Sequence, residues 1–278
     1  MKVAVFGAGT MGSGIAQVFA AKGHTALMYA SSTASAQRHK DKLAASLNKK
    51  VAKGRMTQEA ADDIMSRVLV EEFDAAADAD LVIECVAENM AVKKELLAKL
   101  DALCKDETVF ASNTSSLSIT EMGQGLKHHL IGMHFFNPVP MMKLVEVIKG
   151  QLTSQEVHDK VMAIAAEVGK TPVSVNEAPG FVVNRILIPM VNEGIGIYAD
   201  GVATKEEIDE AMKLGANHPM GPLALGDLIG LDVCLAIMEV LYNEFGDSKY
   251  RPHPLLRKMV RANLLGRKTG IGFYDYRK

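Results

Sequence analysis

The sequence predicts an α/β domain followed by a smaller all-helical domain. Short β-branched, apolar runs alternate with amphipathic stretches as far as about residue 176, the pattern of βαβ units in a parallel sheet. Ala178-Pro179-Gly180 ends this pattern, and helical periodicity without strand-forming runs follows. A length of 278 residues also suits two domains. We expect a first domain over residues 1–180 and a helical domain over residues 181–278.

The individual elements follow from the same patterns. Strands are expected at residues 2–6, 25–29, 68–70, 81–84, 108–112, 130–134, 143–148 and 172–175. Helices are expected at residues 11–22, 34–53, 57–67, 92–103 and 154–168, where apolar residues recur at spacings of three and four. The first of these helices stops at Gly23, a common helix-ending residue. The second domain should hold helices at residues 181–199, 205–213, 222–229, 232–245 and 253–262.

Composition excludes several classes of protein. The content of 48% hydrophobic and 23% charged residues is usual for a folded globular chain. The chain has a formal net charge of -2, so it lacks the excess of basic residues found in many nucleic-acid-binding proteins. No apolar run approaches the ~20 residues that cross a bilayer, and no signal peptide precedes the first strand, so we expect a cytoplasmic protein. Cys85, Cys104 and Cys234 are too few and too far apart for a disulfide framework or a zinc site, so no metal is expected.

A glycine-rich turn joins the first strand to the first helix. The run Gly7-Ala8-Gly9-Thr10-Met11-Gly12 matches G-x-G-x-x-G. In this position the glycines allow a tight turn, and the helix N-terminus offers N–H groups to a pyrophosphate. The sequence therefore predicts a Rossmann-type, doubly wound, mainly parallel sheet that binds a dinucleotide. The alternative is an ordinary strand-turn-helix connection.

The end of the second strand bears on which dinucleotide binds. An Asp or Glu usually stands there and bonds the ribose 2′-hydroxyl of NAD. This chain has Ala30, followed by Ser31, Ser32 and, further on, Arg38. Because no carboxylate at this position repels a 2′-phosphate and donors lie close by, we expect NADP(H) to be favoured over NAD(H). The alternative is a weakened NAD site that discriminates little between the two.

A histidine and a glutamate on neighbouring strands form the candidate catalytic pair. His134 ends one apolar strand, and Glu146 lies within the next. A carboxylate inside an apolar strand needs a partner because burying an unpaired charge is costly. Such a pair suits alcohol oxidation, since the imidazole takes the hydroxyl proton while the carboxylate fixes the tautomer and stabilises the imidazolium. The alternative is a structural histidine at a strand end.

Ordered segments along essentially the whole chain resemble one family, the L-3-hydroxyacyl-CoA dehydrogenases. These segments are GAGTMGSGIAQ, SNTSSLSIT, MHFFNPVPMMKLVEVI, EAPGFVVNRILIPM, AMKLGANHPMGPLALGD and GRKTGIGFYDY. The resemblance implies a dehydrogenase that interconverts acetoacetyl-CoA and (S)-3-hydroxybutyryl-CoA with a nicotinamide cofactor. It also implies a homo-oligomer, at least a dimer formed through the helical domain. Ala30 is a departure from the family, which usually has Asp there.

The resemblance further implies roles for individual residues. The catalytic set would be His134 as base, Glu146 as its partner, and Ser115 and Asn184 as the groups that hold the substrate oxygen and the base in register. Further cofactor contacts would be Glu88, Lys93, Ser115, Asn137 and Lys268. Contacts to substrate and coenzyme A would be Ser46, Lys53, Ser115, Asn137 and Asn184.

Some alternatives stay open at this point. The basic segment 37–55 is either a solvated helix face or a surface for a polyphosphate ligand, and the match at Ser46 and Lys53 favours the second. A non-catalytic nucleotide-binding protein and a dehydrogenase of free 3-hydroxy acids are the other possible functions. Residues 121–129 are expected to form a surface loop. Surface positions are also expected for His24, His39, His128, His129, His158 and His253.

Overall fold

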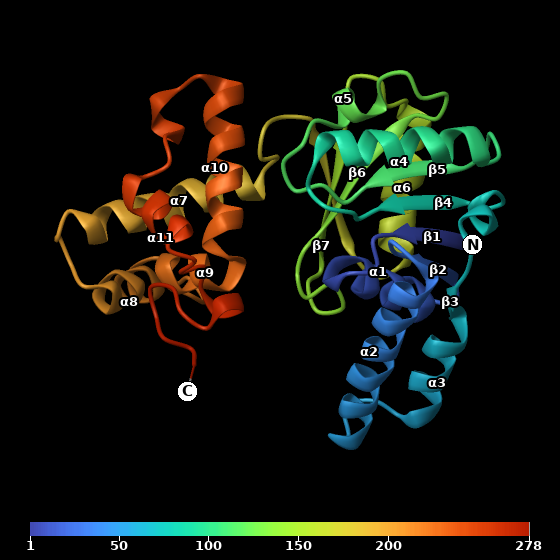
Figure 1. Cartoon of the computed structure of the whole chain (residues 1–278), viewed down its shortest axis with the longest axis horizontal. Helices are drawn as coiled ribbons and strands as arrows, with labels where there is room; N and C mark the ends of the chain where they lie inside the picture. The colour runs from blue at the N-terminus through green and yellow to red at the C-terminus, as the bar shows by residue number, and fades with distance from the viewer. Residues whose placement is uncertain (278) are drawn as a thin grey trace. The chain divides into compact units, whose positions relative to one another are not determined.

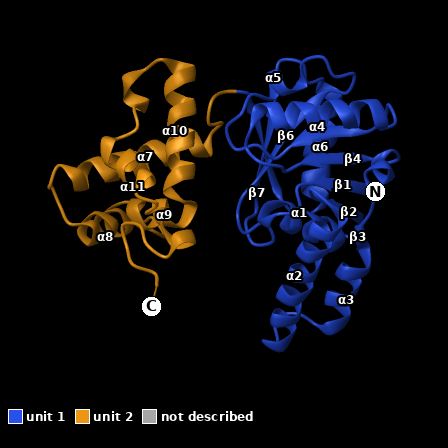
Figure 2. Cartoon of the chain, in the orientation of Figure 1, with its two compact units in different colours: residues 1–177 blue, residues 178–278 orange. Residues whose placement is uncertain are grey.

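The computed structural model describes residues 1–277 (Figure 1). The chain divides into two compact units, Met1–Glu177 and Ala178–Lys278 (Figure 2). Within residues 1–277, no helix combines the length and the apolar character needed to cross a bilayer.

Unit 1 is built on one eight-stranded sheet with the order β3-β2-β1-β4-β5-β6-β7-β8. Its strands are β1 (Lys2–Phe6), β2 (Thr25–Tyr29), β3 (Val68–Val70), β4 (Leu81–Glu84), β5 (Val109–Ser112), β6 (Leu130–Phe135), β7 (Leu144–Lys149) and β8 (Thr171–Asn176). All neighbouring strands run parallel except β6 and β7, which are antiparallel. The predicted Rossmann-type, mainly parallel sheet is therefore confirmed.

Helices cover both faces of this sheet, as the crossover rules for a doubly wound fold require. They are α1 (Thr10–Ala20), α2 (Thr33–Ala52), α3 (Gln58–Arg67), α4 (Met90–Leu103), α5 (Ile119–Gly123) and α6 (Gln155–Glu167), with a short 3₁₀ turn, η1, at Phe73–Ala76. One face carries α1, α2, α3 and α6, which share a buried core that includes Val5, Phe19, Leu47 and Ile164. Figure 1 shows α2 and α3 extending together away from the sheet.

Capping side chains set where several of these helices begin. Ser32 accepts a hydrogen bond from the Ser35 N–H at the start of α2, and Asn89 accepts one from the Val92 N–H at the start of α4. Thr57 and Ser154 play the same part for α3 and α6. The caps at Ser32 and Asn89 matter for the site because each lies just beyond the carboxyl end of a parallel strand.

Unit 2 is all-helical, as predicted. Its helices are α7 (Val183–Ala199), α8 (Lys205–Gly215), α9 (Pro222–Ile229), α10 (Leu231–Phe245) and α11 (Pro254–Arg261), with 3₁₀ turns η2 (Ser248–Tyr250) and η3 (Arg267–Thr269). They surround a second core that includes Ile188, Val191 and Met238. Buried Asp227 accepts hydrogen bonds from the Phe273 and Tyr274 N–H groups at 3.0 and 2.9 Å and so fixes the C-terminal segment.

Two sequence-based expectations about unit 1 are wrong. Residues 121–129 do not form a simple surface loop, because α5 takes in Glu121 to Gly123 and places Met122 in the core at 1% exposure. His24, His128 and His158 are buried rather than on the surface. His128 stacks on Phe110 and bonds Asp101 at 2.6 Å, a pairing between distant segments that no local pattern predicts.

Candidate active site

The glycine-rich turn has the conformation that its motif requires. Gly7 has a φ of 107°, and a Cβ there would lie 2.3 Å from the Cys85 carbonyl oxygen. A Cβ on Gly12 would lie 2.0 Å from the Gly7 carbonyl oxygen, so neither position accepts a side chain. A Cβ on Gly9 would meet nothing within 4 Å, because the backbone there faces open space at the N-terminus of α1. The turn therefore leaves room for a ligand beside the first N–H groups of α1, which have no partner within the helix.

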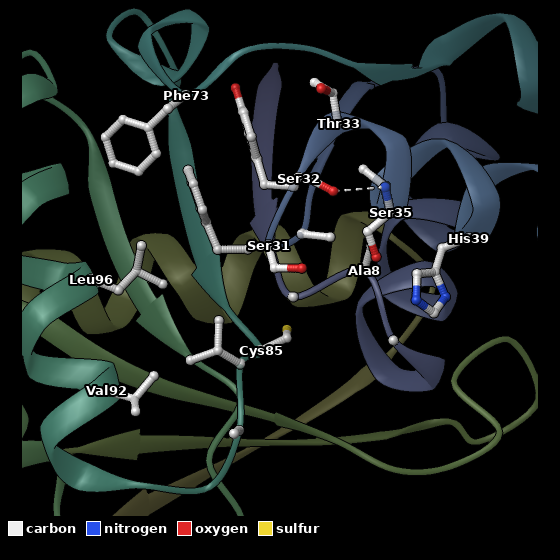
Figure 3. A pocket seen from close by; sticks show the side chains of 18 of the residues that line it. Ala8, Ser31, Ser32, Thr33, Ser35, His39, Phe73, Cys85, Val92 and Leu96 are labelled. Carbon is white, nitrogen blue, oxygen red and sulfur yellow. Dashed lines mark hydrogen bonds between the residues drawn. The ribbon is translucent and has the colours of Figure 1, made fainter.

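A cavity of about 940 Å³ opens at the carboxyl ends of β1, β2 and β4 (Figure 3). Gly7, Ala8 and Gly9 line it from the glycine-rich turn. Its apolar wall comes from Phe73 in η1 and from Val92 and Leu96 on α4. The size of this cavity, and its place at the carboxyl ends of parallel strands and against the glycine-rich turn, suit one nucleotide of a dinucleotide.

The wall next to β2 is lined with small polar residues. Ala30, Ser31, Ser32, Thr33 and Ser35 all line the cavity. Figure 3 labels the hydroxyl-bearing residues among them. Arg38, expected to contribute there, is exposed on α2 and does not line the cavity. The neighbouring His39, expected on the surface, lines it instead. Ser32, Ser35 and His39 recur at spacings of three and four, so helical periodicity could have identified His39 from the sequence.

Charged side chains also line this cavity. Glu71 and Glu72 directly follow β3, and Glu95 and Lys99 lie on α4. The cavity is therefore mixed in charge, although the position that usually carries the ribose-binding carboxylate holds Ala30.

The structure joins His134 and Glu146 directly. The two residues are opposite one another in the antiparallel register of β6 and β7. The His134 Nδ1 lies 2.8 Å from Glu146 Oε2, and the residues are only 4% and 1% exposed. With Nδ1–H donating to the carboxylate, Nε2 is the ring nitrogen that can exchange a proton with a substrate. Such an arrangement can serve a buried general base, because the carboxylate fixes the orientation of the ring.

Ser115 lies in the loop that leaves the carboxyl end of β5. The Asn113 side chain, two residues earlier, accepts a hydrogen bond at 2.8 Å from the Phe135 N–H, next to His134. The Ser115 N–H donates to Glu88 Oε1 at 2.9 Å. Lys93, expected on the cofactor side, is buried and holds Glu84 and Glu88. Loop 113–117 is thus connected both to the end of β6 and to the segment after β4.

The remaining predicted residues lie at several places. Asn137 is exposed two residues after the end of β6. Ser46 and Lys53 are exposed, two turns apart on α2 and at its C-cap, so they share one face. Asn184 is buried on α7, and Lys268 in η3 pairs with Asp232, both in unit 2. As far as residue 277, no group of three or more His, Cys, Asp or Glu side chains is placed to hold a metal ion.

Comparison with known proteins identifies a family whose members bind a dinucleotide in the first domain. Residues 2–178 match the family model described as the 3-hydroxyacyl-CoA dehydrogenase, NAD binding domain, and residues 180–276 match the C-terminal domain of the same family. The chain is 60% identical to a 3-hydroxybutyryl-CoA dehydrogenase of Clostridioides difficile, covering 100% of both chains. It is 43% identical to the human mitochondrial hydroxyacyl-coenzyme A dehydrogenase, over 99% of this chain and 91% of that one.

A solved structure gives the same result. The chain superposes on the (S)-3-hydroxybutyryl-CoA dehydrogenase of Ralstonia eutropha with a TM-score of 0.94 and 48% identity, covering 100% of this chain and 99% of that one. The fold and the site therefore define a two-domain dehydrogenase that uses a nicotinamide cofactor. Within that class, the chain belongs to the 3-hydroxyacyl-CoA dehydrogenase family.

Proposed function

We propose that the chain interconverts acetoacetyl-CoA and (S)-3-hydroxybutyryl-CoA by hydride transfer with a nicotinamide cofactor. The observation that carries this proposal is the buried His134–Glu146 pair, joined at 2.8 Å in the same unit as the nucleotide cavity. The names of the relatives from Clostridioides difficile and Ralstonia eutropha support the four-carbon substrate.

The proposed chemistry assigns a distinct task to each polar group. A bound nicotinamide supplies the hydride acceptor in oxidation and the donor in reduction. His134 Nε2 takes the 3-hydroxyl proton in oxidation and returns it to the forming alkoxide in reduction. Glu146 holds His134 in the required tautomer and stabilises the imidazolium. Ser115 and Asn184 orient the substrate oxygen and the base, and Asn137 lies near the nicotinamide and the substrate.

The coenzyme A part of the substrate is proposed to lie along α2. Ser46 and Lys53 share one exposed face of this helix, and Lys49 and Lys50 in its last turn add positive charge. Phosphate groups of coenzyme A would be attracted to such a face. This placement favours the thioester over a free 3-hydroxy acid, which has no phosphate group to hold.

We further propose that NADP(H) is preferred to NAD(H). Gly7 to Gly12 would hold the pyrophosphate, and Lys268 is assigned to the cofactor side. The preference is supported by Ala30 and by the hydroxyl groups of Ser31, Ser32 and Ser35 on the cavity wall. Arg38 adds positive charge outside the cavity, and His39 adds an imidazole inside it. A preference for NADPH would favour reduction as the direction of flux.

Steady-state kinetics with acetoacetyl-CoA tests the reaction and the cofactor together. NADPH and NADH are compared in parallel, and free acetoacetate replaces the thioester in a third assay. We expect turnover with acetoacetyl-CoA, a kcat/KM for NADPH at least about tenfold above that for NADH, and little activity with acetoacetate. An equal or higher kcat/KM with NADH would refute the NADP preference alone. Activity confined to free acetoacetate would refute the thioester assignment.

The remaining proposals concern assembly and location. Exposed apolar side chains on unit 2 include Ile186, Tyr198, Val202 and Leu214, at 68%, 39%, 73% and 78% exposure. We propose that two copies of the chain bury these side chains against each other and form a homodimer through the helical domain. We also propose that the helical domain takes part in substrate binding. We propose that the enzyme acts in the cytoplasm, with an acyl-CoA as its partner rather than a nucleic acid or a membrane.

A further inference from the structure

A buried cluster of charged and hydroxyl side chains lies at the carboxyl ends of β4 and β5. Glu84 is the last residue of β4 and is 0% exposed, and its register partner on β5 is Ser112. The Ser112 hydroxyl donates to Glu84 Oε2 at 2.6 Å, and the Val86 N–H donates to Oε1 at 2.6 Å. A carboxylate so deeply buried requires a positive partner, which α4 provides.

That partner is Lys93, whose side chain is only 1% exposed. Its ammonium lies 2.7 and 2.9 Å from the two Glu84 oxygens and 3.2 Å from Glu88 Oε2. An ammonium group has three hydrogens, and these two carboxylates, with a longer contact to the Val86 carbonyl oxygen at 3.5 Å, account for them. Lys93 is therefore placed to hold two acidic side chains together rather than to reach a cofactor, the role that the family resemblance implies for it.

Glu88 also forms hydrogen bonds to the loop that carries Ser115. Its Oε1 accepts hydrogen bonds from the Thr114 hydroxyl at 2.6 Å, the Ser115 N–H at 2.9 Å and the Ser116 N–H at 3.2 Å. The Thr114 hydroxyl oxygen in turn accepts from the Leu117 N–H at 3.0 Å. One carboxylate oxygen thus anchors three consecutive residues of loop 113–117.

We infer that Glu88 and Lys93 are positioning residues that set the place of Ser115. The inference rests on the proposed function, in which Ser115 orients the substrate oxygen. Lys93, fixed by Glu84, holds the Glu88 carboxylate, and the Glu88 carboxylate holds the backbone of Ser115. Without this anchor the loop would sample other conformations, and reaction rates fall steeply when a catalytic group is misplaced by about 1 Å.

A double-mutant cycle between Glu88→Ala and Ser115→Ala tests the inference. Glu88→Ala should lower kcat/KM for acetoacetyl-CoA about tenfold to a hundredfold. In the Ser115→Ala background the same change should cost less than about twofold, because its effect acts through Ser115. Glu88→Gln keeps an acceptor oxygen for the loop and should retain more activity than Glu88→Ala. Glu121→Ala, an exposed carboxylate on α5, serves as the control and should leave kcat/KM unchanged.

Two further measurements separate positioning from direct contact. The Kd of the reduced cofactor, followed by its own fluorescence in a chain with no tryptophan, should change less than about twofold in Glu88→Ala. Amide hydrogen exchange at residues 114–117 should become faster in that variant. Two results would each overturn the inference. One is an equal loss of activity from Glu88→Ala in the wild-type and Ser115→Ala backgrounds, together with a raised cofactor Kd. The other is unchanged amide exchange at residues 114–117. If the wild-type chain does not turn over acetoacetyl-CoA, the proposed function fails, while the exchange experiment still tests the anchor.

Discussion

Replacing His134 with Gln is expected to lower kcat by about 10² to 10⁴-fold while leaving cofactor affinity nearly unchanged. Gln approximates the size of the imidazole and its capacity to hydrogen-bond, but it has no nitrogen that takes up a proton near neutral pH. The buried position of His134 against Glu146 makes a compensating water-mediated base difficult to accommodate. Steady-state reduction of acetoacetyl-CoA and titration of the reduced cofactor measure the two quantities separately.

His129→Gln is the matched control for this variant. His129 is exposed and lies just before the start of β6, five residues from His134, with its Nδ1 2.5 Å from the Leu152 carbonyl oxygen. Its substitution should leave kcat within about twofold of wild type. A His134→Gln enzyme that keeps most of its activity would remove His134 from the mechanism and leave it as a structural histidine.

Replacing Glu146 with Gln should also reduce kcat severely, in the same range of about 10² to 10⁴-fold. The amide can present its NH₂ group to His134 Nδ1, which would then accept rather than donate. The ring would carry its proton on Nε2, the position that must be free of it to act as a base in oxidation. The substitution also removes the negative charge that stabilises the imidazolium.

Glu156→Gln provides the comparison, because Glu156 is an exposed residue in the first turn of α6. It should retain wild-type activity. Thermal melting of both variants shows whether any loss in Glu146→Gln comes from unfolding rather than from chemistry. A well-folded Glu146→Gln enzyme with normal kcat would mean that the carboxylate serves only the packing of β7.

Local sequence patterns predict most of the fold because the parallel strands and their helices carry their own periodicity. β1, β2, β3 and β4 begin and end at the expected residues, since each is a short apolar run bounded by turn residues. The five-residue helix α5 was missed because it is too short to show a period. The antiparallel direction of β7 follows from the short connection over residues 136–143, which has no room for a crossover helix, and the apolar runs do not encode this direction.

The site divides in the same way. Glu146 could be assigned a partner because a carboxylate in an apolar strand needs one, and His134 was the nearest candidate in the sequence. The anchoring of Ser115 by Glu88 could not be foreseen, since it depends on β4 and β5 ending side by side. Helical periodicity places His39 on the same face of α2 as Ser32 and Ser35, but which face of α2 turns toward the sheet is set by tertiary packing. The register between strands and the rotation of a helix about its axis depend on tertiary packing, so they are difficult to predict from individual residues.

The most direct test of the proposed reaction follows the transferred hydrogen itself. Acetoacetyl-CoA is reduced with a cofactor that carries deuterium at the transferable position of the nicotinamide, and the product is analysed by mass spectrometry. The account predicts 3-hydroxybutyryl-CoA with one deuterium at C3, formed by the wild-type enzyme and nearly absent with His134→Gln. Product without deuterium at C3, or no product with either cofactor, would contradict direct hydride transfer at this site.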